Sequence, residues 1–133
     1  MALGLVVAAR NASLDDIRIR IDAGATAGFL RVYDGVRPAT GGAATVLLAE
    51  LTFSDPCAPA AAGGVLTFSA IIADASANAT GTASWCRLVD STGAFVADGS
   101  VGVSGADYNL STTAITIGVQ VSCTSAALTA GNP

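Results

Sequence analysis

The sequence has no histidine and no lysine, and its six basic residues are all arginine. Without histidine there is no Ser–His or Cys–His pair to activate a nucleophile, and no imidazole to bind a metal ion. Without lysine the chain has neither a Schiff-base amine nor the lysine of a phosphate-binding loop. Both absences point away from the common classes of enzyme.

The acidic residues offer no clear alternative route to catalysis. They number ten, and Glu50 is the one glutamate among them. The adjacent pair Asp15 and Asp16 is accounted for as negative charge near the start of a helix. Two carboxylates that meet in space, as in a glycoside hydrolase, stay formally possible, but nothing in the sequence selects a pair. We therefore predict a protein that is not an enzyme, with no catalytic residues, no metal site and no cofactor.

Charged and aromatic residues are both scarce. Charged residues make up 12% of the chain, with a net charge of −4. No nucleic-acid partner is expected, because such binding needs a basic patch to neutralise phosphates. Aromatic residues make up 5%, so the core must be built mainly from Val, Leu, Ile and Ala. A surface so poor in charge is a solubility risk for a free monomer and a smaller one for a subunit of an assembly.

The three cysteines, Cys57, Cys86 and Cys123, have no spacing typical of a metal site. Cys86 and Cys123 lie in strand-like runs and are predicted to be small buried apolar residues. One disulfide with a free thiol is left open, although reduced thiols suit assembly in a reducing cytoplasm. The apolar start of the chain lacks the positive region of a signal peptide, and apolar residues 57–73 are interrupted by proline and glycine. We expect a soluble protein with no membrane partner.

One segment is expected to be helical. Residues 13–23 begin with a possible N-cap, Ser13, carry two aspartates in the first turn and end before Gly24. Isoleucine alternates with charged residues over 17–22, which leaves a strand as the alternative for the second half.

From residue 28 onward the pattern becomes that of strands and turns. The expected strands cover residues 29–34, 45–53, 65–74, 82–90, 94–98, 107–110 and 115–124. The run 115–124 alternates most clearly, and a tight hairpin loop is expected at 91–93. Helix 13–23, strands within 28–124 and a C-terminal tail at 126–133 make one domain, residues 1–133. The expected fold is mainly β: an antiparallel β-sandwich or small barrel with one short N-terminal α-helix.

Four residues are candidates for a protein interface. Trp85 and Arg87 lie two residues apart in one expected strand, so they point to the same face, and both types are favoured as interface anchors. Arg31 and Tyr33 repeat this arrangement in an earlier strand. The competing interpretation places Trp85 in the core of the sandwich and Arg87 at a sheet edge.

The C-terminal residues are further candidates. Residues 126–133 contain no charge and are expected to form an edge segment or a tail that a partner would order. The candidate contacts there are Ala126, Leu128 and Pro133.

Motifs spread over most of the chain carry a family resemblance. They are ATGTASWCR at 79–87, DSTG at 90–93, DGSVG at 98–102 and SGADYNL at 104–110, with ARNA at 9–12 and LRVYDG at 30–35. This set resembles a family of small proteins encoded among the virion genes of tailed bacteriophages and prophages. These motifs are patterns of turns and strands and contain no catalytic residues. Cys86 stands where an aromatic residue is expected.

The resemblance implies a structural protein of the virion, most simply a head decoration (cement) protein. Such a protein would bind the lattice of the major capsid protein and copies of itself as a homo-oligomer on the phage head, after synthesis in the host bacterial cytoplasm. A head–tail connector or tail component is an alternative. A carbohydrate- or receptor-binding adhesion module is another, and it would need exposed aromatic residues such as Trp85, Tyr33 and Tyr108.

Overall fold

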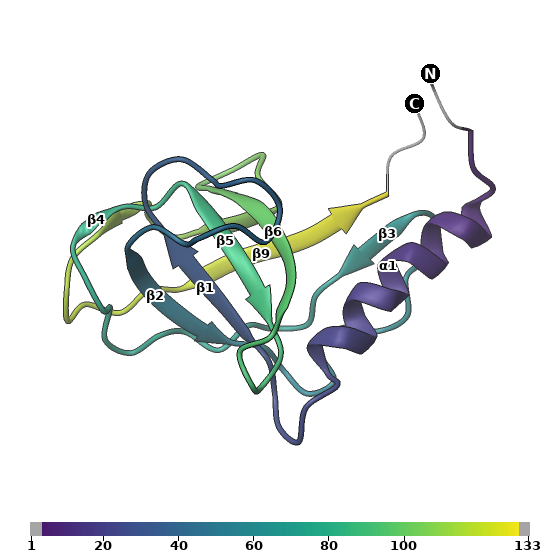
Figure 1. The fold of residues 1–133 in the computed structure, drawn as a ribbon, viewed down its shortest axis with the longest axis horizontal. Helices are drawn as coiled ribbons and strands as arrows, with labels where there is room; N and C mark the ends of the chain where they lie inside the picture. Colours follow the sequence, from purple (N-terminus) through teal and green to yellow (C-terminus); the bar gives the residue numbers. More distant parts are fainter. Residues whose placement is uncertain (1–3, 131–133) are drawn as a thin grey trace.

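The computed structural model describes residues 4–130 of the chain. One helix is followed by nine strands (Figure 1). Their bounds are α1 Val7–Ile21, β1 Phe29–Tyr33, β2 Leu47–Thr52, β3 Val65–Thr67, β4 Gly81–Thr82, β5 Trp85–Val89, β6 Phe95–Gly102, β7 Tyr108–Leu110, β8 Ala114–Ile115 and β9 Cys123–Thr129. The prediction of a mainly β fold with one N-terminal helix is confirmed.

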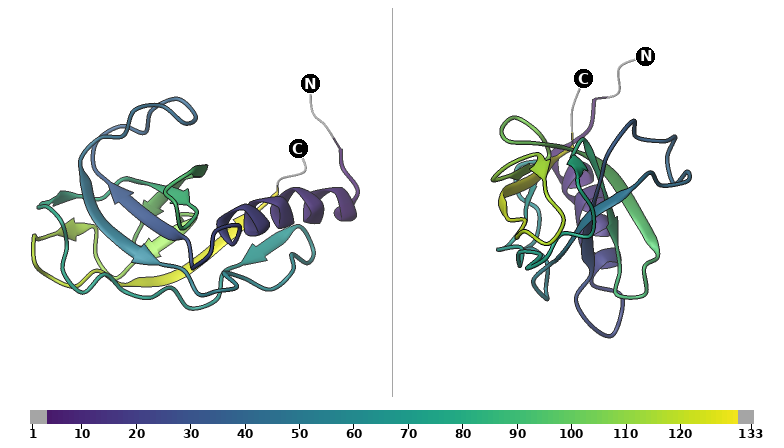
Figure 2. Two further views of the ribbon diagram at one scale, coloured as in Figure 1. Left: turned by 60° about the horizontal axis from the view of Figure 1, so that its bottom comes forward. Right: turned by 90° about the vertical axis from the view of Figure 1, so that its left-hand side faces the viewer.

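Seven strands form one curled sheet in the order β2-β1-β5-β6-β7-β9-β3, and β4 pairs with β8 separately. The sheet curls into a half-barrel, which Figure 2 shows from two sides. All pairings in it are antiparallel except that of β6 with β7. The irregular segment 68–78 runs along the open side: Ile72 bridges to Thr52 of β2, and Asp74 bridges to Val121.

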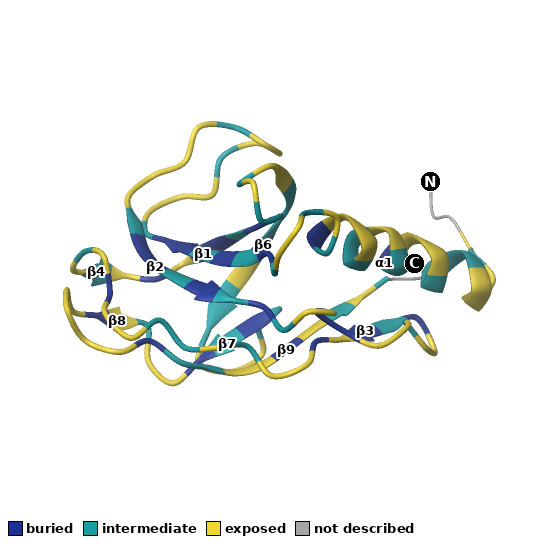
Figure 3. Ribbon diagram, turned by 90° about the horizontal axis from the view of Figure 1, so that it is seen from below, coloured by how far each residue is buried: buried dark blue, intermediate teal, exposed yellow. Residues whose placement is uncertain are grey.

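The main core fills the concave side of this half-barrel (Figure 3). Leu30 and Val32 of β1 enter it together with Leu88 of β5, because alternate residues of a strand share a face. Phe53, Phe68 and Tyr108 add a chain of tilted aromatic contacts, with ring centroids 5.2 and 5.6 Å apart.

The helix α1 begins six residues before the predicted start at Ser13, so that boundary is wrong. Residues 8–12 are Ala, Ala, Arg, Asn and Ala, and the alanines and arginine are strong helix formers that carry the helix back to Val7. Ser13 lies inside the helix, where its hydroxyl donates to the Ala9 carbonyl at 3.2 Å. Because Ile21 is fully buried and Ile19 is 57% exposed, the helical interpretation holds over the alternative of a strand.

Polar side chains of α1 and of Asp22, the residue after its last turn, hold the segment 57–64 along the helix. The side chains of Asn11, Asp15 and Asp22 accept hydrogen bonds from the backbone N–H groups of Gly64, Ala61 and Cys57 at 2.8, 2.8 and 3.1 Å. These bonds satisfy a backbone that forms no regular ladder. With β3 and the end of β9, α1 and this segment form an arm that extends from the half-barrel (Figure 1).

Three sequence-based predictions of strands and tail are wrong in detail. The run 115–124 leaves the strand after Ile115, because Gly118 adopts a left-handed turn with φ +81°, and β9 begins only at Cys123. The predicted tail at 126–133 starts within β9, which pairs with β3 as far as Thr129; residues 131–133 lie outside the described range. The expected strand 65–74 is regular only over its first three residues, β3.

Candidate functional site

The four predicted interface residues gather on one face of the sheet. Register places Tyr33 opposite Trp85 and Arg31 opposite Arg87 in the neighbouring strands β1 and β5. This face is opposite to the main core and lies under the long loop 34–46, which arches over it in Figure 2. We call it the covered face, and residues 34–46 the cover loop.

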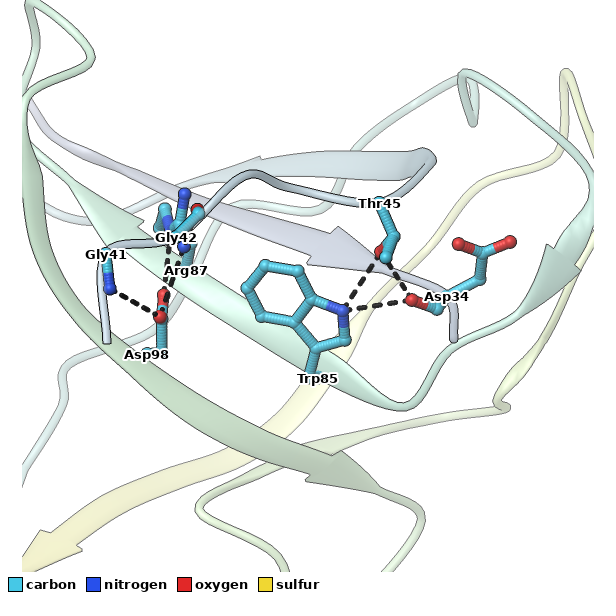
Figure 4. Close-up of polar contacts among 7 residues, drawn as sticks. All are labelled: Asp34, Gly41, Gly42, Thr45, Trp85, Arg87 and Asp98. Carbon is cyan, nitrogen blue, oxygen red and sulfur yellow. Dashed lines mark hydrogen bonds and ion pairs between the residues drawn. The ribbon is translucent and has the colours of Figure 1, made fainter. Parts of the chain in front are cut away.

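Trp85 and Tyr33 form the apolar part of the covered face. Their rings stack with centroids 4.5 Å apart and an interplanar angle of 18°. The Trp85 Nε1–H donates to the Asp34 carbonyl at 2.9 Å and to the Thr45 hydroxyl at 3.0 Å, so the indole holds both ends of the cover loop (Figure 4). Trp85 is 1% exposed and Tyr33 is 6% exposed. Trp85 is therefore buried, as the competing interpretation expected, but in a second cluster outside the main core.

Arg87 forms the polar part of the same face and lies inside it rather than at a sheet edge. Its guanidinium donates to both carboxylate oxygens of Asp98 at 2.7 and 3.1 Å, and to the Gly42 carbonyl of the cover loop at 2.9 Å (Figure 4). It also lies over the rings of Trp85 and Phe95, at 5.2 and 5.1 Å from their centroids. The hydrogen bonds to Asp98 raise the pKa of Arg87 further above its ordinary value, so the guanidinium stays charged.

Arg31 is neutralised separately from Arg87, its neighbour across the β1–β5 ladder. Its Nε lies 2.8 Å from a carboxylate oxygen of Glu50 on β2, and both side chains are about one-third exposed. Each arginine of the covered face thus has its own acid, and the face carries no net charge from these two pairs.

The C-terminal candidates lie elsewhere, on β9. Ala126 is buried, and its carbonyl accepts a hydrogen bond from the Phe68 N–H at 3.1 Å. Leu128 is partly buried and lines a groove beside α1. Pro133 lies outside the described residues. The structure therefore separates the predicted interface residues into two regions, the covered face and the arm.

The outer surface of the cover loop was missed by the sequence analysis. Val36 and Val46 are 85% and 52% exposed, and Phe95, at the start of β6, is 41% exposed. A groove of about 370 Å³ lies between residues 37–40 and residues 95–98. The sequence did contain a signal for this surface, because Val36 and Val46 flank the glycine turn at 41–42. Large apolar side chains in an exposed loop often mark a surface that contacts another molecule.

The cysteines are placed as inert apolar residues. All three are free, Cys57 and Cys86 are fully buried, and Cys123 is partly buried. Burial raises the pKa of the Cys57 thiol to about 12 and that of Cys86 well above its ordinary value. Near neutral pH both stay protonated, which disfavours nucleophilic chemistry because the thiolate is the reactive form.

The aspartates are engaged in holding loops. Seven of them accept a hydrogen bond from a backbone N–H: Asp15, Asp22, Asp34, Asp74, Asp90, Asp98 and Asp107. Within residues 4–130, no cluster of three or more potential metal ligands from His, Cys, Asp and Glu is found. In the same range no helix is long and apolar enough to cross a membrane.

Comparison with known proteins finds no family model, no curated protein and no solved structure that matches the chain.

Proposed function

We propose that this chain is a structural protein of a tailed-bacteriophage particle, a capsid decoration protein that packs on the major capsid protein and stabilises the head. The proposal draws on the resemblance of its turn and strand motifs to small virion proteins. It also draws on a surface with few charges, which suits a subunit held in an assembly.

The observation that carries the proposal is the surface of the cover loop. Val36, Val46 and Phe95 are exposed on or beside a loop whose backbone is fixed from beneath by Trp85 and Arg87. A loop anchored in this way presents its apolar side chains in one conformation, so binding requires little additional ordering. We assign this surface to the contact with the capsid protein.

The burial of aromatic side chains counts against the adhesion-module alternative. Tyr33, Trp85 and Tyr108 are each at most 6% exposed, so none offers the open ring that a sugar would stack on. A glycan array probed with the isolated protein is expected to give no specific signal. A reproducible hit that Phe95→Ala abolishes would favour the adhesion module over the decoration protein.

Copy number separates a decoration protein from a connector or tail component. Quantitative mass spectrometry of purified particles should find the chain in a fixed ratio to the major capsid protein, with copies spread over the shell. A handful of copies per particle, located at one vertex by labelling, would replace the proposal with the connector or tail alternative.

A pair of variants tests the assigned surface. Phe95→Asp should weaken the binding of the purified protein to particles that lack it, because a charge would enter an apolar contact. Ile72→Asp, an exposed apolar position on the open side of the half-barrel, should bind as the wild type does. Equal binding by all three proteins would remove the cover loop from the interface.

A further inference from the structure

The first half of β6 forms an open edge within the curled sheet. β6 pairs with β5 over residues 95–100, but β7 pairs with it only at Val101 and Gly102. Residues 95–99 therefore have a neighbouring strand on one side only. We call these residues the open edge.

The backbone N–H and carbonyl of Asp98 point outward from the open edge. Successive residues of a strand direct these groups to opposite sides, and the Ser100 N–H donates to the Asp107 side chain at 3.2 Å rather than to β5. The Asp90 N–H donates to the Ala94 carbonyl, so the even-numbered residues of β5 face β6, where their register partners are odd-numbered. Asp98 therefore faces away from β5. Outside the β5 ladder, no group in residues 4–130 bonds to its N–H or carbonyl.

A groove lies on each face of the open edge. The groove of about 370 Å³ described above lies on the side of the cover loop, and a second, of about 340 Å³, lies on the side of α1. Ala97 and Asp98 line both grooves. Core residues form the floor of the second groove, and its more accessible wall includes Ser13, Ile17 and Leu128. A strand added to the open edge would direct alternate side chains into the two grooves.

The groove on the side of the cover loop carries an uncompensated positive charge. Arg37 lines it, is exposed and has no ion-pair partner in the described range 4–130. The acid on this groove, Asp98, already binds Arg87 and accepts a hydrogen bond from the Gly41 N–H. A carboxylate that enters this groove can therefore pair with Arg37.

The groove on the side of α1 has a different character. Asp107 lies on it, and no arginine lines it within the described part of the chain. Ile17 and Leu128 supply apolar surface there. The two grooves thus suit an acidic side chain on the side of the cover loop and an apolar one on the side of α1.

We propose that an extended segment of the capsid protein adds to the open edge as a further strand, with a carboxylate side chain beside Arg37 and an apolar side chain on the side of α1. The Asp98 N–H and carbonyl supply backbone hydrogen bonds, and the two grooves select the side chains. This inference rests on the proposed function and specifies the kind of segment that the capsid protein contributes. A second copy of this chain fits less well, because its residues 1–14 and 108–133 contain no acid.

The first experiment changes the charge of Arg37 and measures binding of the purified full chain to particles that lack it. Arg37→Glu should weaken binding about 10-fold or more, because a like charge would then face the carboxylate. Arg37→Lys should keep most of the affinity, because it keeps the charge. The matched control is Arg20→Glu, which makes the same change in net charge on α1, where the Arg20 side chain is 66% exposed. This control should bind as the wild type does.

The second experiment follows hydrogen exchange at single amides of the particle-bound protein. Exchange at the Asp98 N–H should slow at least about 10-fold, because this group gains a hydrogen bond to the added strand. The N–H groups of Ala97 and Gly99 face β5 and should change little. Mass spectrometry with residue-resolved fragmentation measures all three. A contact that only covers the edge would not select alternate amides.

The third experiment blocks the groove on the side of α1. Ser13→Trp places an indole on its wall and should weaken particle binding about as much as Arg37→Glu does. Ala12→Trp adds the same side chain at the neighbouring exposed position, outside the groove, and should bind as the wild type does. Equal binding by both tryptophan variants would contradict the added strand.

The outcomes separate this inference from the proposed function. Failure of the wild type to bind particles would overturn both. Loss of binding in Phe95→Asp without loss in Arg37→Glu would leave the capsid contact in place and overturn the added acidic strand. Equal losses in Arg37→Glu and Arg20→Glu would also overturn it, as would an Asp98 N–H that exchanges as fast in the bound protein as in the free one. Circular dichroism and urea unfolding confirm that each variant is folded.

Discussion

At the scale of single residues, Arg87 joins more parts of the covered face than any other side chain described above. It contacts Asp98 on β6, Gly42 in the cover loop and the rings of Trp85 and Phe95. The Arg87 and Asp98 side chains are 12% and 5% exposed, so both charges are largely removed from water. The pair is worth most as a unit, because a buried charge without its partner is costly.

Replacing Arg87 by alanine should therefore lower the free energy of unfolding by about 3 kcal/mol, since the Asp98 carboxylate loses its partner. Arg87→Lys should lower the free energy of unfolding by about half as much, because an ammonium group keeps the charge but cannot form the bidentate hydrogen bonds to Asp98. Urea unfolding followed by circular dichroism measures both.

Arg31→Ala serves as the comparison. Its ion pair with Glu50 is about one-third exposed on both sides, and such pairs contribute about 1 kcal/mol or less. If Arg31→Ala lowers the free energy of unfolding as much as Arg87→Ala does, burial does not determine how much each ion pair contributes.

Thiol labelling tests the placement of the cysteines. At about pH 8 the native protein should react with a thiol reagent at Cys123 alone, because Cys57 and Cys86 are fully buried and their pKa values are raised. After unfolding in urea all three should react. Fast labelling of Cys57 or Cys86 in the native state, located by peptide mass spectrometry, would contradict this placement.

The same thiols make stability depend on pH in the alkaline range. The pKa of Cys57 rises from 9.0 to about 12 on folding, so the unfolded chain loses its proton first. Stability is full below pH 9 and falls as pH rises from there toward 12. Unfolding free energies at about pH 8 and about pH 10.5 should show the fall, and Cys57→Ala should reduce it. A slope unchanged in Cys57→Ala would assign the effect to other groups.

At the scale of elements, the cover loop depends on few bonds to keep its place over the sheet. Trp85 Nε1–H holds its two ends through Asp34 and Thr45, and Arg87 holds its middle through Gly42. The strands beneath are paired on both sides. The loop and the sheet should therefore open with different free energies.

Trp85→Phe tests this independence. Phenylalanine keeps a ring for Tyr33 to stack on but has no N–H, so hydrogen exchange in residues 34–46 should speed up, while β1 and β5 keep their protection. The cost in global stability should be about 1 kcal/mol, the net value of a hydrogen bond. Equal loss of protection in loop and strands would mean that they open as one unit.

The sequence predicted the elements that local patterns determine and missed those that distant contacts determine. β1, β5 and the hairpin into β6 follow from alternation and from Gly93, whose φ of +87° suits the tight turn. The break at Gly118 was not predictable, because its N–H bonds to Ala77, far away in the chain. The candidate site was likewise predicted only in part. The two-residue spacing in each strand correctly predicted that each arginine and its aromatic neighbour lie on the same face. The cover loop that buries them depends on contacts across 40 or more residues.

At the scale of the whole molecule, stability rests on apolar packing rather than on charge. The described residues contain four ion pairs, and Arg87–Asp98 is the one that is mostly buried. The other three are exposed enough to contribute little.

The response to salt should reflect this balance. Raising sodium chloride to about 1 M should change the free energy of unfolding by less than about 1 kcal/mol, whereas sulfate at the same ionic strength should increase it, because sulfate strengthens apolar burial. Thermal or urea unfolding in the two salts measures the difference. A loss of several kcal/mol in sodium chloride would mean that charge pairs hold the fold together.

The arm also sets the order in which the chain can mature during synthesis. α1 is made before the segments that it contacts: Asn11 accepts a hydrogen bond from the Gly64 N–H, and Arg10 donates to the Ala130 carbonyl, 120 residues later. These contacts of the helix therefore close only after the residues up to Ala130 have been made. Leu14 and Ile21, which are buried in the folded chain, stay uncovered while the segments that pack on α1 are still being made, so the nascent chain exposes apolar side chains of this helix during that interval.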